Sequence, residues 1–191
     1  MRLEPLATGT VESLTIDGKP VESIRFALDG PEGDLHSAIT RKLAGHDGRY
    51  VQTSDLSQGC EVFNWRTWTG LGAEEIAEVE ETLGLDIPQG CLLENITVSG
   101  IPDFTHLAPT SRLVFPSHGD GEDITQAILA VWEENSPCAG VGNRLEAHHD
   151  KEGLCTDFIR AALGKRGVMG FVLSAGVVRV GDAVSAFPPV R

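Results

Sequence analysis

The sequence predicts a mainly β protein with a few peripheral helices (an α+β chain), folded as a closed or partly open antiparallel β-barrel. Three observations support this prediction. Short apolar runs crowd both ends of the chain, Gly and Asp residues separate them, and only two segments show a clear helical period. A parallel sheet would need helices between its successive strands, and that alternation is missing.

The N-terminal strands are expected to form a hairpin. Residues 11–16 alternate between apolar and polar side chains, Asp17-Gly18 supplies turn chemistry, and residues 21–28 resume the strand pattern. The C-terminus has the same character, with strands predicted at 168–173, 177–180 and 183–187. Gly-containing turns divide these three runs.

Two segments are predicted as helices, 73–83 and 156–163, each followed by a glycine that can end a helix in the left-handed conformation. The apolar run 126–132 is ambiguous, and a buried strand is the favoured interpretation. Residues 30–48 are polar and rich in glycine, which indicates a long surface loop. The acidic side of the first helix is expected to be solvated; it carries Glu74, Glu75, Glu78 and Glu81.

Length and charge limit the possible functions. A chain of 191 residues suits one domain, taken as residues 1–191. The net charge of −13 disfavours a nucleic-acid partner, because an acidic protein repels a phosphate backbone. No run approaches the roughly 20 apolar residues of a membrane span, and the N-terminus lacks a signal-peptide pattern. A cytoplasmic location without membrane contact is therefore expected.

Four cysteines are present, and none forms a Cys-x-x-Cys pair, which argues against a zinc ribbon or a thioredoxin-like site. In a reducing compartment free thiols are expected. Cys60, Cys91 and Cys155 lie in apolar contexts typical of structural cysteines.

Cys138 has a different context. Ser136 and Pro137 suit the N-cap and first position of a helix, which would place Cys138 in the first turn. There the positive helix end favours the thiolate, which is the nucleophilic and metal-binding form of cysteine. Small residues at 139, 140 and 142 leave room for a ligand.

The order of several short motifs resembles the MOSC domain, the molybdenum-cofactor-sulfurase C-terminal domain, in a stand-alone bacterial form. The similar segments span about 33–187: Gly33-Asp34-Leu35-His36, Asn64-Trp65-Arg66, the 90–96 segment with Glu94-Asn95, Asn135-Ser136-Pro137-Cys138, Lys165-Arg166-Gly167-Val168, and Gly181-Asp182. Each match is short, and their consistent order makes the set specific.

The resemblance implies a reactive Cys138 that either carries sulfur as a persulfide or ligates molybdenum in a bound molybdopterin cofactor. Arg166 would hold an anionic group. The other expected cofactor-binding residues are Arg66, Asn95, His36 and Ser136. A cysteine desulfurase would be the sulfur donor, and a molybdoenzyme or a metal-cluster protein the acceptor. No pyridoxal phosphate site is evident. The sequence leaves the oligomeric state undecided.

Three functions stay open at this point. Besides sulfur transfer, the chain could be a molybdenum-cofactor-dependent reductase of N-hydroxylated compounds, or a non-catalytic module that binds anions or partners. Two departures from the family pattern bear on the pocket. Leu93 stands where relatives carry a glycine before Glu-Asn, and Ser37-Ala38 follow His36 where a glycine is usual.

Two further hypotheses concern the pocket. Trp65 and Trp68 could stack on a flat ligand, with Arg66 taking its phosphate. A dyad of Cys138 with His36 or His149 would support thiol chemistry. His148-His149 is otherwise expected in a solvated loop.

Overall fold

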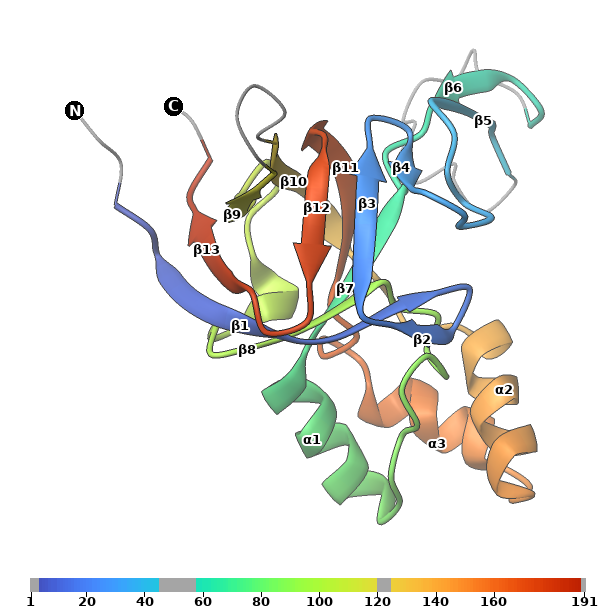
Figure 1. The fold of residues 1–191 in the computed structure, drawn as a ribbon. Helices are drawn as coiled ribbons and strands as arrows, with labels where there is room; N and C mark the ends of the chain where they lie inside the picture. Colours follow the sequence, from blue (N-terminus) through green and yellow to red (C-terminus); the bar gives the residue numbers. More distant parts are fainter. Residues whose placement is uncertain (1–3, 45–57, 120–124, 190–191) are drawn as a thin grey trace.

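The computed structural model describes residues 4–44, 58–119 and 125–189. Within them, seven strands close into a barrel in the order β13-β9-β10-β11-β7-β8-β1, with β1 pairing back to β13 (Figure 1). The bounds of these strands are β1 Ala7–Ile16, β7 Trp68–Gly72, β8 Ile96–Ser99, β9 Arg112–His118, β10 Thr125–Glu134, β11 Val168–Ser174 and β13 Ala183–Phe187. The predicted closed barrel is confirmed, and the strand predicted at 126–132 is β10.

The barrel interior is an apolar core. Because successive strand residues point to opposite faces, every second side chain projects inward. The largest inward side chains are almost free of solvent contact and include Trp68, Phe26, Phe115, Leu129 and Ile96. Closure between β1 and β13 pairs Ala7 with Ala186 and Thr10 with Ala183. The barrel thus provides a rigid wall for the segments outside it.

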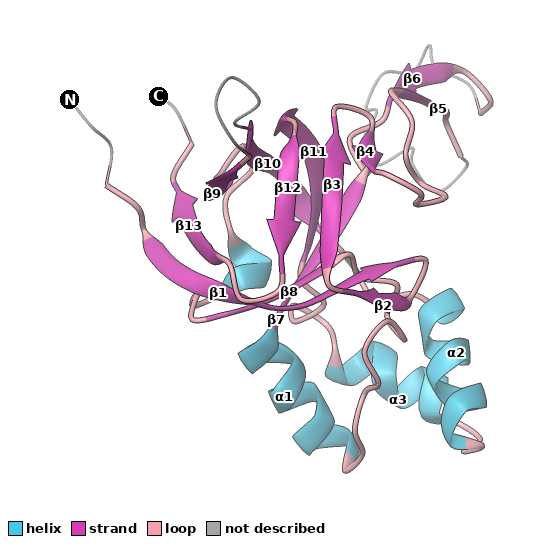
Figure 2. Ribbon diagram, in the orientation of Figure 1, coloured by secondary structure: helices cyan, strands magenta, loops and turns pink. Residues whose placement is uncertain are grey.

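One pair of barrel strands is parallel, which corrects the expectation of a wholly antiparallel barrel. β7 and β8 run in the same direction, with Gly70 opposite Ile96. A parallel pair requires a crossover, and the helix α1 (Ala73–Leu83) lies within this connection (Figure 2). The 73–83 helix, predicted at these same bounds, is the element that allows the parallel pairing.

The terminal strands pair differently from the simple hairpins predicted. Asp17-Gly18 does connect β1 to β2 (Lys19–Val21), with Leu14 opposite Val21. The chain then leaves this ladder, and β3 (Ser23–Ala27) pairs with β12 (Gly176–Arg179) and β4 (Gly30–Pro31) in a second sheet. Consecutive strands β11, β12 and β13 therefore pair with distant partners.

Three helices gather at one end of the barrel (Figure 1). Besides α1 they are α2 (Ala139–His149) and α3 (Leu154–Ala161), which pack on one another and enclose a second apolar cluster around Leu145 and Phe158. The predicted 156–163 helix is confirmed with bounds two residues earlier. A helix start was predicted at Ser136-Pro137, but the length of α2 was not, because Gly140 and Gly142 lower its helix propensity. A short 3₁₀ helix, η2, covers Phe104–His106.

The segment predicted as a loop at 30–48 contains two short strands. β4 belongs to the second sheet, and β5 (Thr40–Lys42) pairs with β6 (Glu61–Phe63). The remainder of its described part is irregular, and residues 45–48 lie outside the described residues.

The acidic side of α1 is exposed at Glu74, Glu78 and Glu81, as expected, whereas Glu75 is partly buried. Glu75 accepts hydrogen bonds from the backbone N–H and the hydroxyl of Thr105, at 3.0 and 2.6 Å. Glu74 accepts one from the Gly100 amide at 2.7 Å. Glu78 pairs with Lys165 at the surface. Glu74 and Glu75 therefore fix α1 to the segment that follows β8.

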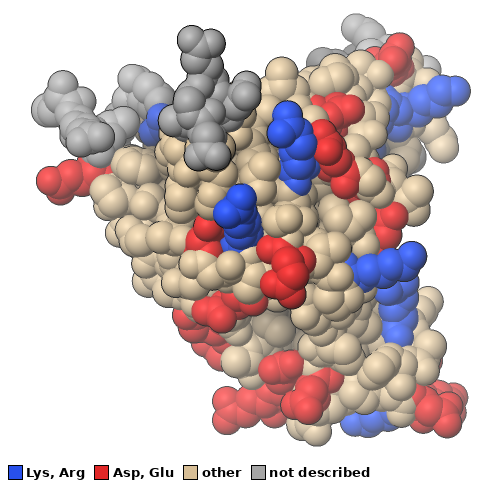
Figure 3. All heavy atoms as spheres, viewed as in Figure 1, with Lys and Arg blue, Asp and Glu red and all other residues tan. Residues whose placement is uncertain are grey.

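Among the described residues no helix combines the length and apolar character needed to cross a membrane. On the face shown in Figure 3, Lys and Arg side chains are interspersed with acidic ones and do not form a single basic patch.

Candidate functional site

A pocket of about 800 Å³ lies against the outer side of the barrel. Its floor includes Thr67, Thr69 and Met169, which alternate along β7 and β11 with side chains of the barrel core. All six residues predicted for the site line it together: Cys138, Arg166, Arg66, Asn95, His36 and Ser136. The volume is in the usual range for a small-molecule or cofactor site.

Cys138 is exposed and stands at the N-terminus of α2. It is itself the N-cap residue, with extended backbone angles of −136° and 160°, and its carbonyl accepts the first turn's bond from the Gly142 amide at 3.0 Å. The helix therefore starts two residues later than the predicted Ser136 cap. No side-chain hydrogen bond caps the helix. Cys138 thus lies at the end of the helix where the first-turn N–H groups carry partial positive charge.

Arg166 brings a buried positive charge to the same pocket. The residue is only 4% exposed. Its Nη2 donates to the carbonyl oxygen of Leu92 at 2.6 Å, whereas Nε and Nη1 have no hydrogen-bond partner within the described parts of the chain. Burial lowers the pKa of the guanidinium, and the negative charges of Cys138 and Glu94 oppose that shift. A buried donor without a partner is costly, so these N–H groups are suited to a bound anion.

Hydrogen bonds of the next residue, Gly167, hold the backbone at Arg166 in position. Gly167, with a φ of 74°, has no room for a side chain, because a Cβ would lie 1.9 Å from the Gly70 carbonyl oxygen. Its amide donates to the Thr105 hydroxyl at 2.7 Å, and its carbonyl accepts from the Asn135 amide at 2.9 Å. The Gly167 peptide therefore connects the Arg166 segment to the turn that carries Cys138, and Glu75 supports it through Thr105.

Glu94 lies buried close to this arginine. One of its carboxylate oxygens accepts the Gly90 amide at 2.5 Å, and the other has no partner among the residues described. Burial raises the pKa of Glu94, and the Gly90 hydrogen bond and the Arg166 charge oppose the rise.

Asn95 lines the pocket and also joins three parts of the fold. Its Oδ1 accepts the Thr69 amide at 2.9 Å, while Nδ2 donates to the Thr15 carbonyl at 3.3 Å and to Asp34 Oδ2 at 2.8 Å. With its amide atoms used in this way, Asn95 holds the walls of the pocket in position.

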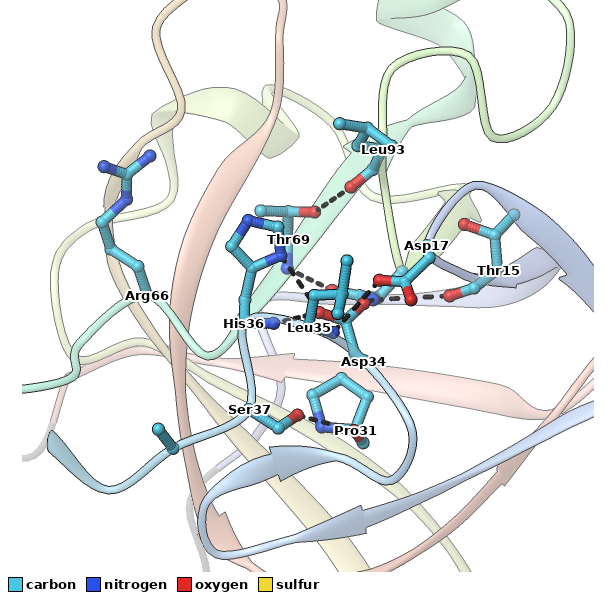
Figure 4. Close-up of polar contacts among 12 residues, drawn as sticks. Thr15, Asp17, Pro31, Asp34, Leu35, His36, Ser37, Arg66, Thr69 and Leu93 are labelled. Atoms are coloured by element: carbon cyan, nitrogen blue, oxygen red, sulfur yellow. Dashed lines mark hydrogen bonds and ion pairs between the residues drawn. The ribbon is translucent and has the colours of Figure 1, made fainter. Parts of the chain in front are cut away.

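His36 stands at the rim of the pocket on a loop held by Asp34 (Figure 4). Its Nδ1 lies 3.1 Å from Asp34 Oδ1, which also accepts the His36 amide at 2.8 Å. The Asp34 side chain is 5% exposed and that of His36 is 69% exposed. The aspartate is therefore the fixed member of the pair, and the imidazole faces solvent.

The pair shifts both pKa values. Burial alone would raise the pKa of Asp34, but the hydrogen bonds from His36 and Asn95 outweigh it and lower the pKa to about 2. The hydrogen bond to Asp34 raises the pKa of His36, partly opposed by burial. These directions favour a charged imidazolium.

The two tryptophans do not offer a stacking surface to a ligand. Trp68 is among the residues that line the pocket, but it is only 1% exposed and donates its indole N–H to the Phe171 carbonyl at 3.2 Å. Trp65 is also buried, contacts the ring of Trp132, and carries Arg41 over its face at 4.9 Å from the centroid. Arg66 lines the pocket, as predicted.

The departures at 93 and 37–38 leave the pocket open. Leu93 keeps the left-handed conformation that a glycine would adopt, with a φ of 57°, and its carbonyl accepts the Thr69 hydroxyl at 3.0 Å. The Ser37 hydroxyl donates to the Pro31 carbonyl at 2.6 Å, away from the cavity. The backbone path is therefore retained at the cost of strain at Leu93.

The other thiols and histidines lie elsewhere. Cys91 is buried, and burial raises its pKa. Cys60 and Cys155 are partly buried. His149 ends α2, within a helix and not the predicted loop, and its Nε2 lies 2.9 Å from the Asp86 carbonyl, so it does not serve the pocket.

Sequence reasoning missed Asn64, Thr69 and Asn135 as pocket residues, although two of them stand inside the motifs quoted above. Asn64 donates to the carbonyls of His36 and Ala38 and so shapes the loop at the rim. An asparagine next to a predicted site residue was the available signal.

Comparison with known proteins identifies the family of this chain. The family model for the MOSC domain matches residues 66–185. A Bacillus subtilis protein, YuaD, whose name refers to metal-sulfur cluster biosynthesis, is 32% identical over 169 residues, which cover 87% of this chain and 80% of YuaD.

Solved structures extend the likeness to the whole fold. The crystal structure of YuaD from Bacillus subtilis superposes with a TM-score of 0.83 at 29% identity, covering 99% of this chain and all of that one. YiiM from Escherichia coli has a TM-score of 0.56 at 16% identity, covering 96% of this chain and 71% of that chain, and shows the fold alone. The chain described here belongs to the MOSC domain family.

Proposed function

We propose that the protein is a sulfur carrier in which Cys138 accepts sulfane sulfur as a persulfide and passes it to a metal-containing acceptor. The observation that supports this most is the pairing of an exposed thiol at a helix N-terminus with the buried Arg166, whose Nε and Nη1 lack a partner among the described residues. The helix end supplies partial positive charge beside the attacking sulfur, and the guanidinium would stabilise the anionic persulfide. The name of the relative YuaD agrees with this role.

The experiment is sulfur loading followed by mass spectrometry. The protein is incubated with a cysteine desulfurase and cysteine, digested without reductant, and mapped. We expect an added mass of one sulfur atom on the peptide with Cys138, and no such adduct in Cys138→Ser. Cys155→Ser is the matched control, because this thiol is partly buried beside the same helix. An unmodified wild type, or equal loading of Cys138→Ser, would contradict the proposal.

A second candidate is binding of the molybdenum cofactor, and the size of the pocket favours it. A cavity of about 800 Å³ is larger than a single sulfur atom requires. The donor set fits the group: a thiolate is a suitable soft ligand for molybdenum, and the buried Arg166 donors suit an anionic part of the cofactor. Cys138, Arg166 and Arg66 would hold it, and it would supply redox chemistry, such as reduction of N-hydroxylated compounds.

Metal analysis distinguishes the two candidates. Protein produced in a host that makes the cofactor is assayed for molybdenum and for pterin fluorescence. Molybdenum at a stoichiometric level that is lost in Cys138→Ser would support cofactor binding. Its absence, together with sulfur loading of Cys138, would leave the carrier role. Failure of both would favour a non-catalytic anion-binding module.

A further inference from the structure

We infer that His36, held by Asp34, is the general acid that protonates the thiolate leaving group when Cys138 takes sulfur from a donor. This inference rests on the proposed carrier function and adds a second catalytic residue to the same pocket. Four features of the structure lead to it: the shared cavity, the fixed orientation of the imidazole, its free nitrogen, and the charges around it.

The shared cavity places His36 and Cys138 on one ligand. Both line the same pocket of about 800 Å³, so a donor that fills this pocket can lie against the thiol and the imidazole. A pocket of this size leaves space for a substrate between them, as an acid that acts on a leaving group requires.

The orientation of the ring is fixed by a buried carboxylate. Asp34 Oδ1 binds both the amide and Nδ1 of His36, and Asp34 Oδ2 is held by Asn95 Nδ2 at 2.8 Å. Asp34 is therefore anchored to Asn95, the residue before β8. With Nδ1 occupied, Nε2 is the nitrogen left to act, and it has no hydrogen-bond partner in the described part of the chain.

The charges around the ring favour its protonated form. Asp34 and Asp17 both favour the imidazolium, and Figure 4 shows their carboxylates on one side of the ring. Arg66 is the charged group that opposes it. Asp34 lies in the same loop as His36, Asp17 in the β1–β2 turn, and Arg66 in the segment before β7.

The chemical step is balanced without an oxidant or a reductant. The Cys138 thiolate attacks the outer sulfur of a donor persulfide, R–S–SH. The new bond joins Cys138 Sγ to that sulfur, the donor S–S bond breaks, and its electron pair leaves on R–S⁻. Nε2–H of His36 protonates R–S⁻ to R–SH, and water later restores the proton. Cys138 then carries –S–SH, and the sum of charges is unchanged.

This role predicts a dependence on the leaving group. An alkyl thiolate is basic and gains from a proton as the S–S bond breaks, whereas an aromatic thiolate leaves readily without one. A histidine that only shapes the pocket would affect both classes equally.

The test compares two disulfide probes, cystine and an aromatic disulfide that releases thionitrobenzoate, on the full chain with EDTA present. Rates at Cys138 are measured by site-resolved mass spectrometry between about pH 5 and 9. For wild type we expect a rate with cystine that falls as pH rises through the raised pKa of His36, and no such fall with the aromatic probe. His36→Gln should slow the cystine reaction by on the order of 10²-fold and the aromatic reaction by about twofold or less. His148→Gln, at the exposed end of α2, is the matched control.

Equal slowing of both probes by His36→Gln, or no slowing of either, would overturn the inference. If His36→Gln fails to fold, the wild-type pH profiles decide alone: a fall at high pH with both probes, or with neither, has the same consequence. The disulfide probes do not require sulfur carriage. A protein that shows the leaving-group dependence but takes no sulfur from a desulfurase would therefore contradict only the proposed function.

Discussion

The barrel interior and the pocket on its outer wall share strands β7 and β11, but the side chains on the two sides differ in polarity and in how well they are paired. Inside, the side chains of Trp68, Val168 and Leu129 are apolar and almost fully buried. Outside the barrel, the pocket contains the buried guanidinium of Arg166, two of whose nitrogens have no partner among the described residues. It also contains the strained Leu93 and the exposed thiol of Cys138. The interior supplies stability, and the pocket retains groups that only a ligand would satisfy. The predictions below separate these two contributions.

The largest effect on stability is expected in the interior. Leu129→Ala leaves a cavity in a fully buried position of β10, and it should lower the free energy of unfolding by about 2–5 kcal/mol. Urea denaturation measures this loss. Because the core lies on the other side of the wall, the alkylation rate of Cys138 in native buffer should stay unchanged. A change in that rate equal to the one seen in pocket variants would show that the two regions are not separable.

The next largest effect is a dependence of stability on acid. The pKa of Asp34 is lowered from 3.8 to about 2, so its ionised form stabilises the fold by about 2 kcal/mol above pH 3.8, and this is lost as pH falls through 2. The raised pKa of His36 has the opposite sign: its contribution is complete below pH 6.5 and is lost as pH rises through the folded-state value.

Urea denaturation from pH 2 to 8 tests both pH-dependent contributions to the unfolding free energy. Asp34→Asn should abolish the loss of unfolding free energy in acid, and His36→Gln should abolish the loss above pH 6.5. Unfolding curves of the two variants that follow the wild-type pH dependence would show that this pair contributes nothing to stability.

Arg166 should matter more to reactivity than to stability. Arg166→Met relieves the desolvation cost of a buried charge but removes one hydrogen bond to Leu92 and the positive charge near the buried Glu94, so its effects on the unfolding free energy oppose one another. The rate at which Cys138 reacts with anionic iodoacetate, relative to neutral iodoacetamide, should fall about tenfold, or about 1.4 kcal/mol. Arg160→Met, at an exposed site on α3, is the control. An unchanged ratio of the two alkylation rates in Arg166→Met would show that the guanidinium does not attract anions to Cys138.

The smallest effect is expected at Leu93. Its φ of 57° is strained for a β-carbon-bearing residue, so Leu93→Gly should raise unfolding free energy by about 0.5–1 kcal/mol after the entropy of the unfolded glycine is counted. Leu93→Asn, which tolerates this conformation, should gain as well. Destabilisation by both variants would show that leucine packing outweighs the backbone strain at this position.

Sequence patterns predicted the local elements better than their pairing. The 73–83 helix, the strand at 126–132 and the three C-terminal strands are visible as periodicity and turn chemistry, and these are local properties. The parallel contact between β7 and β8 and the departure of β3 to pair with β12 depend on residues far apart in the chain. No spacing in a single sequence shows such pairing.

The sequence predicted which residues form the site, but not how they are arranged and supported in three dimensions. Ordered motifs pointed to Cys138 and Arg166, and both line one pocket. The supporting groups were missed because their roles arise only in three dimensions. Glu75 looked like part of a solvated helix face, yet through Thr105 it supports Gly167 beside Arg166. The start of α2 was placed early, because Ser136-Pro137 is a good helix start and the extended backbone of Cys138 is not visible in the sequence.

The most direct test of the central claim is the rate of iodoacetamide modification at each thiol of the native protein, followed by mass spectrometry. Cys138 should react first, Cys60 and Cys155 more slowly, and the buried Cys91 last. A Cys138 that reacts no faster than Cys91 would contradict a reactive thiol at the pocket, and with it the carrier function.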